Sequence, residues 1–198
     1  MCDSGKTCGN ISCVVQPVKS ASAVNGFLLN TVLVFGMACV TAIAAQATIP
    51  WEPVPFTMQT VAVLLSGLLL GARKGYMSQL VYLGAGVAGW PVFAGGGHGL
   101  HTAIGETGGY LISFPLAAMA LGFMSEAGWT RSFRGAVLAL FFGNALILAL
   151  GWGWLSVAIG PRAAFIHGVA PFLQGAVLKS ILVFACLPGV WSGSFRRG

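Results

Sequence analysis

Charged residues are scarce in this sequence. They make up 7% of its 198 residues, and only 4 of them are acidic, whereas a soluble domain carries roughly 25% charged residues. Hydrophobic residues make up 57% of the chain, and the mean hydropathy is +0.86. A soluble domain of this length has no core large enough to hide so much apolar surface from water. The composition therefore predicts an integral membrane protein.

Groups of metal-ligating residues are also missing. The chain has 5 cysteines, and no two of them have the C-x-x-C spacing of a zinc site. His98 and His101 lie close together, and Glu106 is the only further ligand that their segment offers. Free thiols in a reducing compartment and ordinary polar contacts of the histidines explain these residues better than a metal does. We therefore expect no metal site and no cofactor.

Motifs for catalysis and for nucleotide binding are absent as well. Ser66-Gly67 lacks the first glycine of a nucleophile motif, and the apolar runs offer no histidine as its base. The SGKT at residues 4–7 lacks the earlier glycine of a phosphate-binding loop. The net charge is +6, but the basic residues lie at the ends of apolar runs rather than in one patch. We expect no enzymatic activity, no nucleic-acid binding and no ability to drive transport with ATP unaided.

Long apolar runs are what the sequence does contain. They predict six membrane spans, at residues 26–49, 57–72, 76–88, 110–124, 135–159 and 171–187. The expected fold is an all-α integral membrane protein, a compact bundle of six transmembrane helices. A polar N-terminal tail (residues 1–23) precedes the membrane domain (residues 24–189), and a basic C-terminal tail follows (residues 190–198).

The distribution of basic residues predicts the orientation of the bundle. With six spans, eight basic residues fall on one side, and only Arg162 lies in a loop on the other side. The positive-inside rule makes the basic side cytoplasmic, with both termini there. The eight residues are Lys6, Lys19, Arg73, Lys74, Arg131, Arg134, Arg196 and Arg197.

A glycine-rich segment at residues 90–111 joins the third and fourth predicted spans. Irregular backbone at membrane depth persists only where protein buries it or where it lines a wet cavity. The segment is thus a candidate wall or lid of a polar site. The glycines alone are equally compatible with an exposed flexible loop.

Lys179 is the most unusual residue of the predicted spans, because it lies near the middle of the last one. A lysine at such depth is costly unless it snorkels, pairs with another group or meets water. A ligand carboxylate or polar head group would stabilise it, and so would a pair with Glu106 or with a backbone carbonyl. Gln59, one turn below the outer loop, is the other polar residue best placed to meet a ligand.

Ala38 and Ala42 lie one helical turn apart in the first span. Small residues at this spacing let a second membrane helix approach closely. This face could dock another subunit, or it could pack within the same chain.

Several spaced motifs together resemble the BioY family, the biotin-binding S components of energy-coupling-factor (ECF) transporters. The resemblance covers about residues 26–187. The motifs are residues 53–59 (PVPFTMQ), 68–71 (LLLG), 91–96 (PVFAGG), 105–110 (GETGGY) and 171–173 (PFL), followed by Lys179.

The resemblance implies a multi-pass protein of the cytoplasmic (inner) membrane of a bacterium, surrounded by lipid, that captures biotin near its outer face. It implies a transmembrane T subunit and two ATPase subunits as partners, with docking through the small residues Ala38 and Ala42. Together with the residue-level reasoning it gives a candidate substrate-binding set: Gln59, Gly96, Gly97, His98, Gly108, Gly109, Tyr110 and Lys179.

One position departs from the family pattern. Many members have Gly-Asp-x-x-Lys in the last helix, where this chain has Gly175, Ala176 and Lys179. The lysine is kept, and alanine replaces the acid. Two alternatives to a vitamin-binding transporter subunit stay open at this point: a membrane-embedded enzyme, and an assembly protein without a ligand.

Overall fold

The computed structural model describes residues 23–49 and 53–186, which fold into helices joined by short turns. A small hairpin of strands β1 (Thr48–Ile49) and β2 (Phe56–Thr57) is paired antiparallel, with Thr48 opposite Thr57. Two short 3-10 helices are η1 (Ala94–Gly96) and η2 (Trp129–Arg131). The α-helices are α1 (Ala23–Gln46), α2 (Gln59–Leu70), α3 (Ala72–Val87), α4 (Gly99–Ile104), α5 (Gly108–Glu126), α6 (Phe133–Ile159), α7 (Pro161–Gly168) and α8 (Ala170–Ala185).

Four helical stretches of the described chain are long and apolar enough to cross a membrane. They are Gly26–Gln46, Gly108–Glu126, Phe133–Ile159 and Pro161–Ala185, the last combining α7 and α8. Helices α2 and α3 have 12 and 16 residues, and a span of the hydrocarbon core needs about 20. The chain is therefore an all-α membrane protein apart from its hairpin, whereas six full-length spans are not evident from helix length.

The end of the first predicted span is corrected by the structure. We expected helix to residue 49, but α1 ends at Gln46 and the chain turns into β1. The hairpin uses backbone groups that the helix end would otherwise leave unpaired, and the Met58 N–H also donates to the Ala47 carbonyl at 3.2 Å. The connection predicted between the first two spans, residues 50–56, thus contributes to a strand pair, and residues 50–52 lie outside the described chain.

The break between the second and third spans also differs from the prediction. We placed it at residues 73–75, but the chain turns at Gly71, whose φ of 82° favours glycine. Helices α2 and α3 then run back antiparallel in close contact, since a Cβ on Gly75 would lie 2.9 Å from the Gly67 Cα. Arg73 and Lys74 accordingly belong to the first turn of α3.

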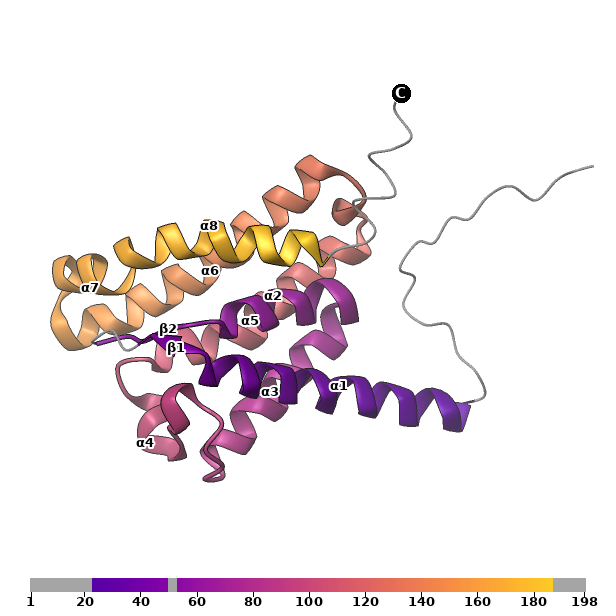
Figure 1. Cartoon of the computed structure of the whole chain (residues 1–198), viewed down its shortest axis with the longest axis horizontal. Helices are drawn as coiled ribbons and strands as arrows, with labels where there is room; N and C mark the ends of the chain where they lie inside the picture. The colour runs from indigo at the N-terminus through magenta and orange to yellow at the C-terminus, as the bar shows by residue number, and fades with distance from the viewer. Residues whose placement is uncertain (1–22, 50–52, 187–198) are drawn as a thin grey trace, which may run out of the picture.

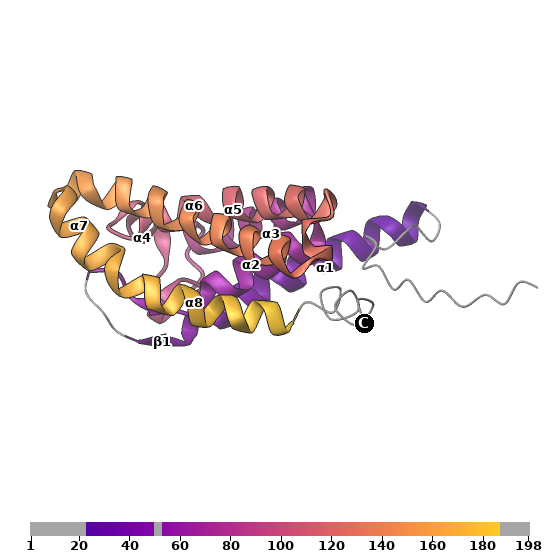
Figure 2. The same ribbon diagram turned by 90° about the horizontal axis from the view of Figure 1, so that it is seen from above.

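Short helices occur in two of the predicted connections, the glycine-rich segment (residues 90–111) and the connection between the fifth and sixth predicted spans, which carries Arg162. Helix α4 lies within the glycine-rich segment, and α7 fills most of the later one. Figure 1 shows α4, α7 and the hairpin at one end of the molecule, with the first residues of α1 and the last of α8 at the other. Figure 2 confirms that α1 extends past the other helices at that second end. The predicted tails beyond these ends lie outside the described residues.

The turns at the second end are tied to each other. The Ala72 N–H donates to Glu126 Oε1 at 2.8 Å, which joins the α2–α3 turn to the end of α5. Lys74 Nζ donates to Asn30 Oδ1 of α1 at 3.3 Å. The basic residues of the α2–α3 and α5–α6 connections therefore share one end of the bundle.

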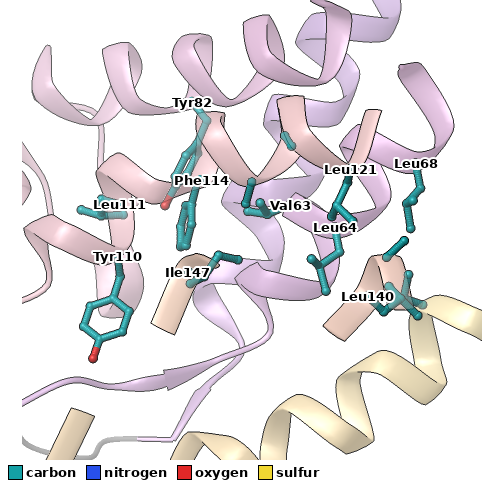
Figure 3. Packing of buried hydrophobic residues seen from close by; sticks show 14 of the residues in the cluster. Val63, Leu64, Leu68, Tyr82, Tyr110, Leu111, Phe114, Leu121, Leu140 and Ile147 are labelled. Atoms are coloured by element: carbon teal, nitrogen blue, oxygen red, sulfur yellow. The ribbon is translucent and has the colours of Figure 1, made fainter. Parts of the chain in front are cut away.

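The hydrophobic core runs along α5, which packs against α2, α3 and α6. Ala117, Ala118 and Leu121 of α5 are fully buried, and Figure 3 shows the core extending from Tyr110 to Leu68 and Leu140. Between α6 and α8, the buried side chain of Asn144 donates from Nδ2 to Ser180 Oγ at 3.1 Å. This arrangement leaves room for a cavity where α5, α8 and the hairpin meet.

Candidate functional site

A cavity of about 160 Å³ lies toward the end of the bundle that carries the hairpin, α4 and α7. Its walls come from β2 and the start of α2, from the segment around Phe93, and from α4, α5, α6 and α8. Most of the lining is apolar or aromatic, and the polar groups are few. Gln59, Tyr110 and Lys179 all line this one cavity, although they are far apart in the sequence.

Lys179 is 4% exposed and holds the only positive charge among the lining residues. Its Nζ lies 4.1 Å from the centroid of the Phe56 ring, within the range of a cation–π interaction. Gly175, one turn earlier in α8, makes room for that ring, because a Cβ there would overlap it. Within the described chain, no carboxylate pairs with Lys179, and Glu106 is exposed and outside the lining. The contact of Lys179 with a ligand stays a prediction.

Three aromatic rings form a row beside Lys179. Phe56 stacks on Phe172 with centroids 5.7 Å apart, and Phe172 lies 6.2 Å from Tyr110 in a tilted arrangement. The Tyr110 hydroxyl donates to the Gly168 carbonyl at 2.7 Å. The row joins β2, α8 and α5, and two of its members, Phe172 and Tyr110, line the cavity.

Gln59 belongs to a hydrogen-bonded chain that crosses three segments. Thr57 Oγ1 donates to Gln59 Oε1 at 2.9 Å, and Gln59 Nε2 donates to the hydroxyl oxygen of Tyr82. That hydroxyl donates to the Val92 carbonyl at 3.1 Å. The Tyr82 ring meets the Phe93 ring edge-on at 5.7 Å. The chain fixes the start of α2 against α3 and the glycine-rich segment.

The other predicted substrate residues are not part of the cavity lining. His98 is exposed, with Nδ1 3.3 Å from the Gly96 carbonyl oxygen, and Gly97 lies against Thr102. Gly108 and Gly109 pack α5 against Trp154 of α6, because a Cβ on either would press into that side chain. Other residues of the same segment line the cavity instead, among them Ala94, Thr102 and Thr107. The role of the predicted residues toward a ligand stays a prediction.

Sequence reasoning missed most of the lining, including Phe172 and Thr60, and it also missed Phe56, whose ring lies against the Lys179 ammonium. Thr60 directly follows Gln59, and Phe172 lies two turns before Lys179. Both positions place them at the same end of the bundle as the residues that were predicted. That spacing was the available signal, but phenylalanine is too common in apolar spans to stand out.

The small face of α1 packs inside the chain. Ala38 is 6% exposed, and Ala42 lies against the core. Between them, Thr41 Oγ1 accepts a bond of 3.2 Å from Gln79 Nε2 of α3. The opposite face of α1 carries exposed apolar side chains. Docking through Ala38 and Ala42 stays a prediction.

These features define a class of protein. The chain is a helical membrane protein with a largely apolar cavity toward one end of its bundle, and a buried ammonium group belongs to the lining of that cavity. No group of three metal-ligating side chains occurs within the described chain. Such a cavity suits a small organic molecule with an apolar body and a few polar groups.

Comparison with known proteins specifies the family. The sequence profile of the BioY family matches residues 17–195. A probable biotin transporter BioY of Lysinibacillus sphaericus is 41% identical over 163 residues, which cover 80% of this chain and 81% of the relative. A probable biotin transporter BioY of Pyrococcus horikoshii is 39% identical over 142 residues, covering 71% and 82% of the two chains.

A solved structure shares the fold. The crystal structure of the S-component for biotin from an ECF-type ABC transporter aligns with a TM-score of 0.73 and 25% identity, covering 84% of this chain and 93% of the other. The chain belongs to the BioY family.

Proposed function

We propose that this chain is the biotin-binding S component of an ECF-type transporter and captures biotin for uptake. The observation that carries the proposal is Lys179, a buried ammonium in an aromatic-walled cavity without a carboxylate partner among the described residues, in a chain of the BioY family. Biotin combines a carboxylate and a polar ureido ring with an apolar ring and side chain. The aromatic row would pack against the apolar parts, and Lys179 would meet the carboxylate or the ureido oxygen.

We infer six spans with the cavity toward the outside. Helices α2 and α3 would be short spans, completed by their neighbours, and α8 would be the last span. The start of α3, with Arg73 and Lys74, and the η2–α6 region, with Arg131 and Arg134, lie at the end away from the cavity. The positive-inside rule supports assigning that end, and the tails beyond it, to the cytoplasm.

The chain would act together with other subunits. It carries no nucleotide-binding motif, so release of biotin to the inside requires energy from elsewhere. We propose a T subunit and two ATPases as partners in the inner membrane of a bacterium. The relative described as part of an ECF-type ABC transporter supports this assembly. Substrate contacts are proposed for Gln59, Tyr110 and Lys179 first, and for Gly96, Gly97, His98, Gly108 and Gly109 through the adjoining segment.

A biotin titration tests this function. Purified protein in detergent should bind biotin saturably, and excess thiamine or riboflavin should not compete. Binding of all three vitamins, or of none, would contradict the assignment. Absence of binding would favour an assembly protein, and chemical change of the recovered biotin would favour an enzyme.

A further inference from the structure

The side-chain oxygen of Thr60 is buried and has no hydrogen-bond partner. Thr60 lies in the first turn of α2, directly after Gln59, and lines the cavity. A buried hydroxyl without a partner costs free energy in the folded state. The other unpartnered buried oxygen of the described chain, Gln79 Oε1, is not part of the cavity lining. Of the two buried side-chain oxygens without a partner in the described chain, Thr60 Oγ1 is thus the one that belongs to a residue of the cavity lining.

Three of the other hydroxyl groups in the cavity lining are engaged within the protein, and the fourth, that of Thr107, has no hydrogen bond within the described chain but is not a buried oxygen. Thr57 donates to Gln59, Thr102 donates to the His98 carbonyl at 2.8 Å, and Tyr110 donates to the Gly168 carbonyl. Each of these bonds fixes the hydroxyl within the protein. The Thr60 hydroxyl is free to turn toward a molecule in the cavity.

A ureido ring needs acceptors for its N–H groups, and the cavity has few. The ammonium of Lys179 can only donate, and no carboxylate is found among the described lining residues. We propose that Thr60 Oγ1 accepts a hydrogen bond from a ring N–H of biotin and thereby orients the ring at the start of α2. This inference rests on the proposed function and adds to it a specificity-determining residue.

The test is a comparison of Thr60→Val with wild type. Valine keeps the shape and removes the hydroxyl, so biotin affinity should fall at least tenfold while the melting temperature without biotin is unchanged or raised. Thr60→Ser should keep most of the affinity. Thr31→Val serves as the matched control, because Thr31 lies on α1, its hydroxyl bonds its own helix, and it is outside the lining.

Biotin analogues identify the contacted group. Biotin methyl ester lacks the carboxylate, and Thr60→Val should weaken its binding by the same factor as for biotin. Analogues methylated at each ring nitrogen in turn should bind wild type more weakly, and for one of them the Thr60→Val penalty should vanish. If the valine variant folds poorly, Thr60→Ala replaces it in both comparisons, since alanine also removes the hydroxyl.

Two results would overturn the inference. Equal biotin affinity of wild type and Thr60→Val would show that the hydroxyl makes no contact. A penalty that disappears with the methyl ester would assign Thr60 to the carboxylate instead. Failure of wild type itself to bind biotin is a different result, and it would reject the proposed function rather than the role of Thr60.

Discussion

The hydroxyl of Tyr110, in the first turn of α5, donates to the main-chain carbonyl of Gly168 at the end of α7, with the two oxygens 2.7 Å apart. Gly168 is required at this contact, since a Cβ there would lie 2.5 Å from the same hydroxyl. The bond therefore closes one side of the cavity by joining two elements 58 positions apart in the sequence.

Removing this bond should loosen the cavity. We expect Tyr110→Phe to lower the free energy of unfolding by about 1 kcal/mol, as a buried hydrogen bond typically contributes, and to weaken biotin binding moderately. Thermal unfolding and a biotin titration measure the two effects. Tyr76→Phe on α3 is the matched control, because no hydrogen bond of the Tyr76 hydroxyl is found in the described chain. Equal stability of the two variants would contradict the role of the bond.

Lys179 should matter for binding more than for folding. Lys179→Met has a similar length and no charge, so it should insert and fold at least as well as wild type, given that a lysine in a span costs about 2.5–3.5 kcal/mol on insertion. Biotin affinity should fall at least about tenfold, which corresponds to roughly 1.4 kcal/mol. Lys179→Arg should also bind poorly, because a planar fork does not replace a compact ammonium.

The control for Lys179 is Lys74→Met, at the opposite end of the bundle. Biotin titrations and melting curves on Lys179→Met, Lys179→Arg and Lys74→Met distinguish a ligand contact of Lys179 from a structural role. Unchanged affinity combined with a lower melting temperature would make it a structural ion and place the substrate elsewhere.

Gly109 should prove to be a packing residue of the α5–α6 contact. A methyl group at this position would overlap Trp154 Cβ and approach the Leu150 carbonyl oxygen at 2.8 Å. Overpacking of this kind costs about 1–3 kcal/mol, so Gly109→Ala should lower the melting temperature. Gly153→Ala, within α6 and with open space around its Cβ, should leave stability unchanged or raise it. A variant Gly109→Ala that melts normally but loses biotin would instead make Gly109 a ligand contact.

Sequence alone placed the long helices well, because an uninterrupted apolar run has few alternatives in a membrane. The sequence did not predict the exact turns and the short strands. The turn at Gly71 depends on a positive φ. As a sequence signal for the helix end, this glycine is less conspicuous than the Arg73-Lys74 pair, where the break was predicted. The hairpin of Thr48–Ile49 with Phe56–Thr57 is too short for a periodic pattern, and it forms only because the two segments meet.

The sequence predicted those site residues that are energetically costly to place in an apolar span. Lys179 and Gln59 are conspicuous in an apolar span, and both line the cavity. Phe56 is not conspicuous, and only the fold brings its ring under the ammonium. The pair Gly108-Gly109 suggested a loop near the ligand, whereas the structure uses it to pack one helix against another. A glycine pattern does not distinguish a flexible backbone from a close contact.

Docking of a T subunit can be tested on the small face of α1. Ala38→Trp should lower the melting temperature of the isolated protein, because Ala38 is buried against the core. Ala42→Trp is the more informative variant, since Ala42 is only partly buried. We expect it to bind biotin near-normally and to lose co-purification with a T subunit. Ile43→Trp, at a position that is 72% exposed, should assemble normally. Loss of assembly in Ile43→Trp alone would move the docking surface to the exposed face of α1.

The orientation of the bundle is open to a direct labelling experiment. Single cysteines at His101, in α4, and at Arg73, at the start of α3, would lie at opposite ends of the bundle. In a background with the native cysteines replaced, a membrane-impermeant maleimide added to intact cells should label the first position and not the second. After the membrane is permeabilised, both should react, which controls for buried thiols. The positive-inside rule predicts this result because Arg73, Lys74, Arg131 and Arg134 share the end away from the cavity. Labelling of the Arg73 position in intact cells would place the cavity on the cytoplasmic side, and a protein so oriented could not capture its ligand from outside.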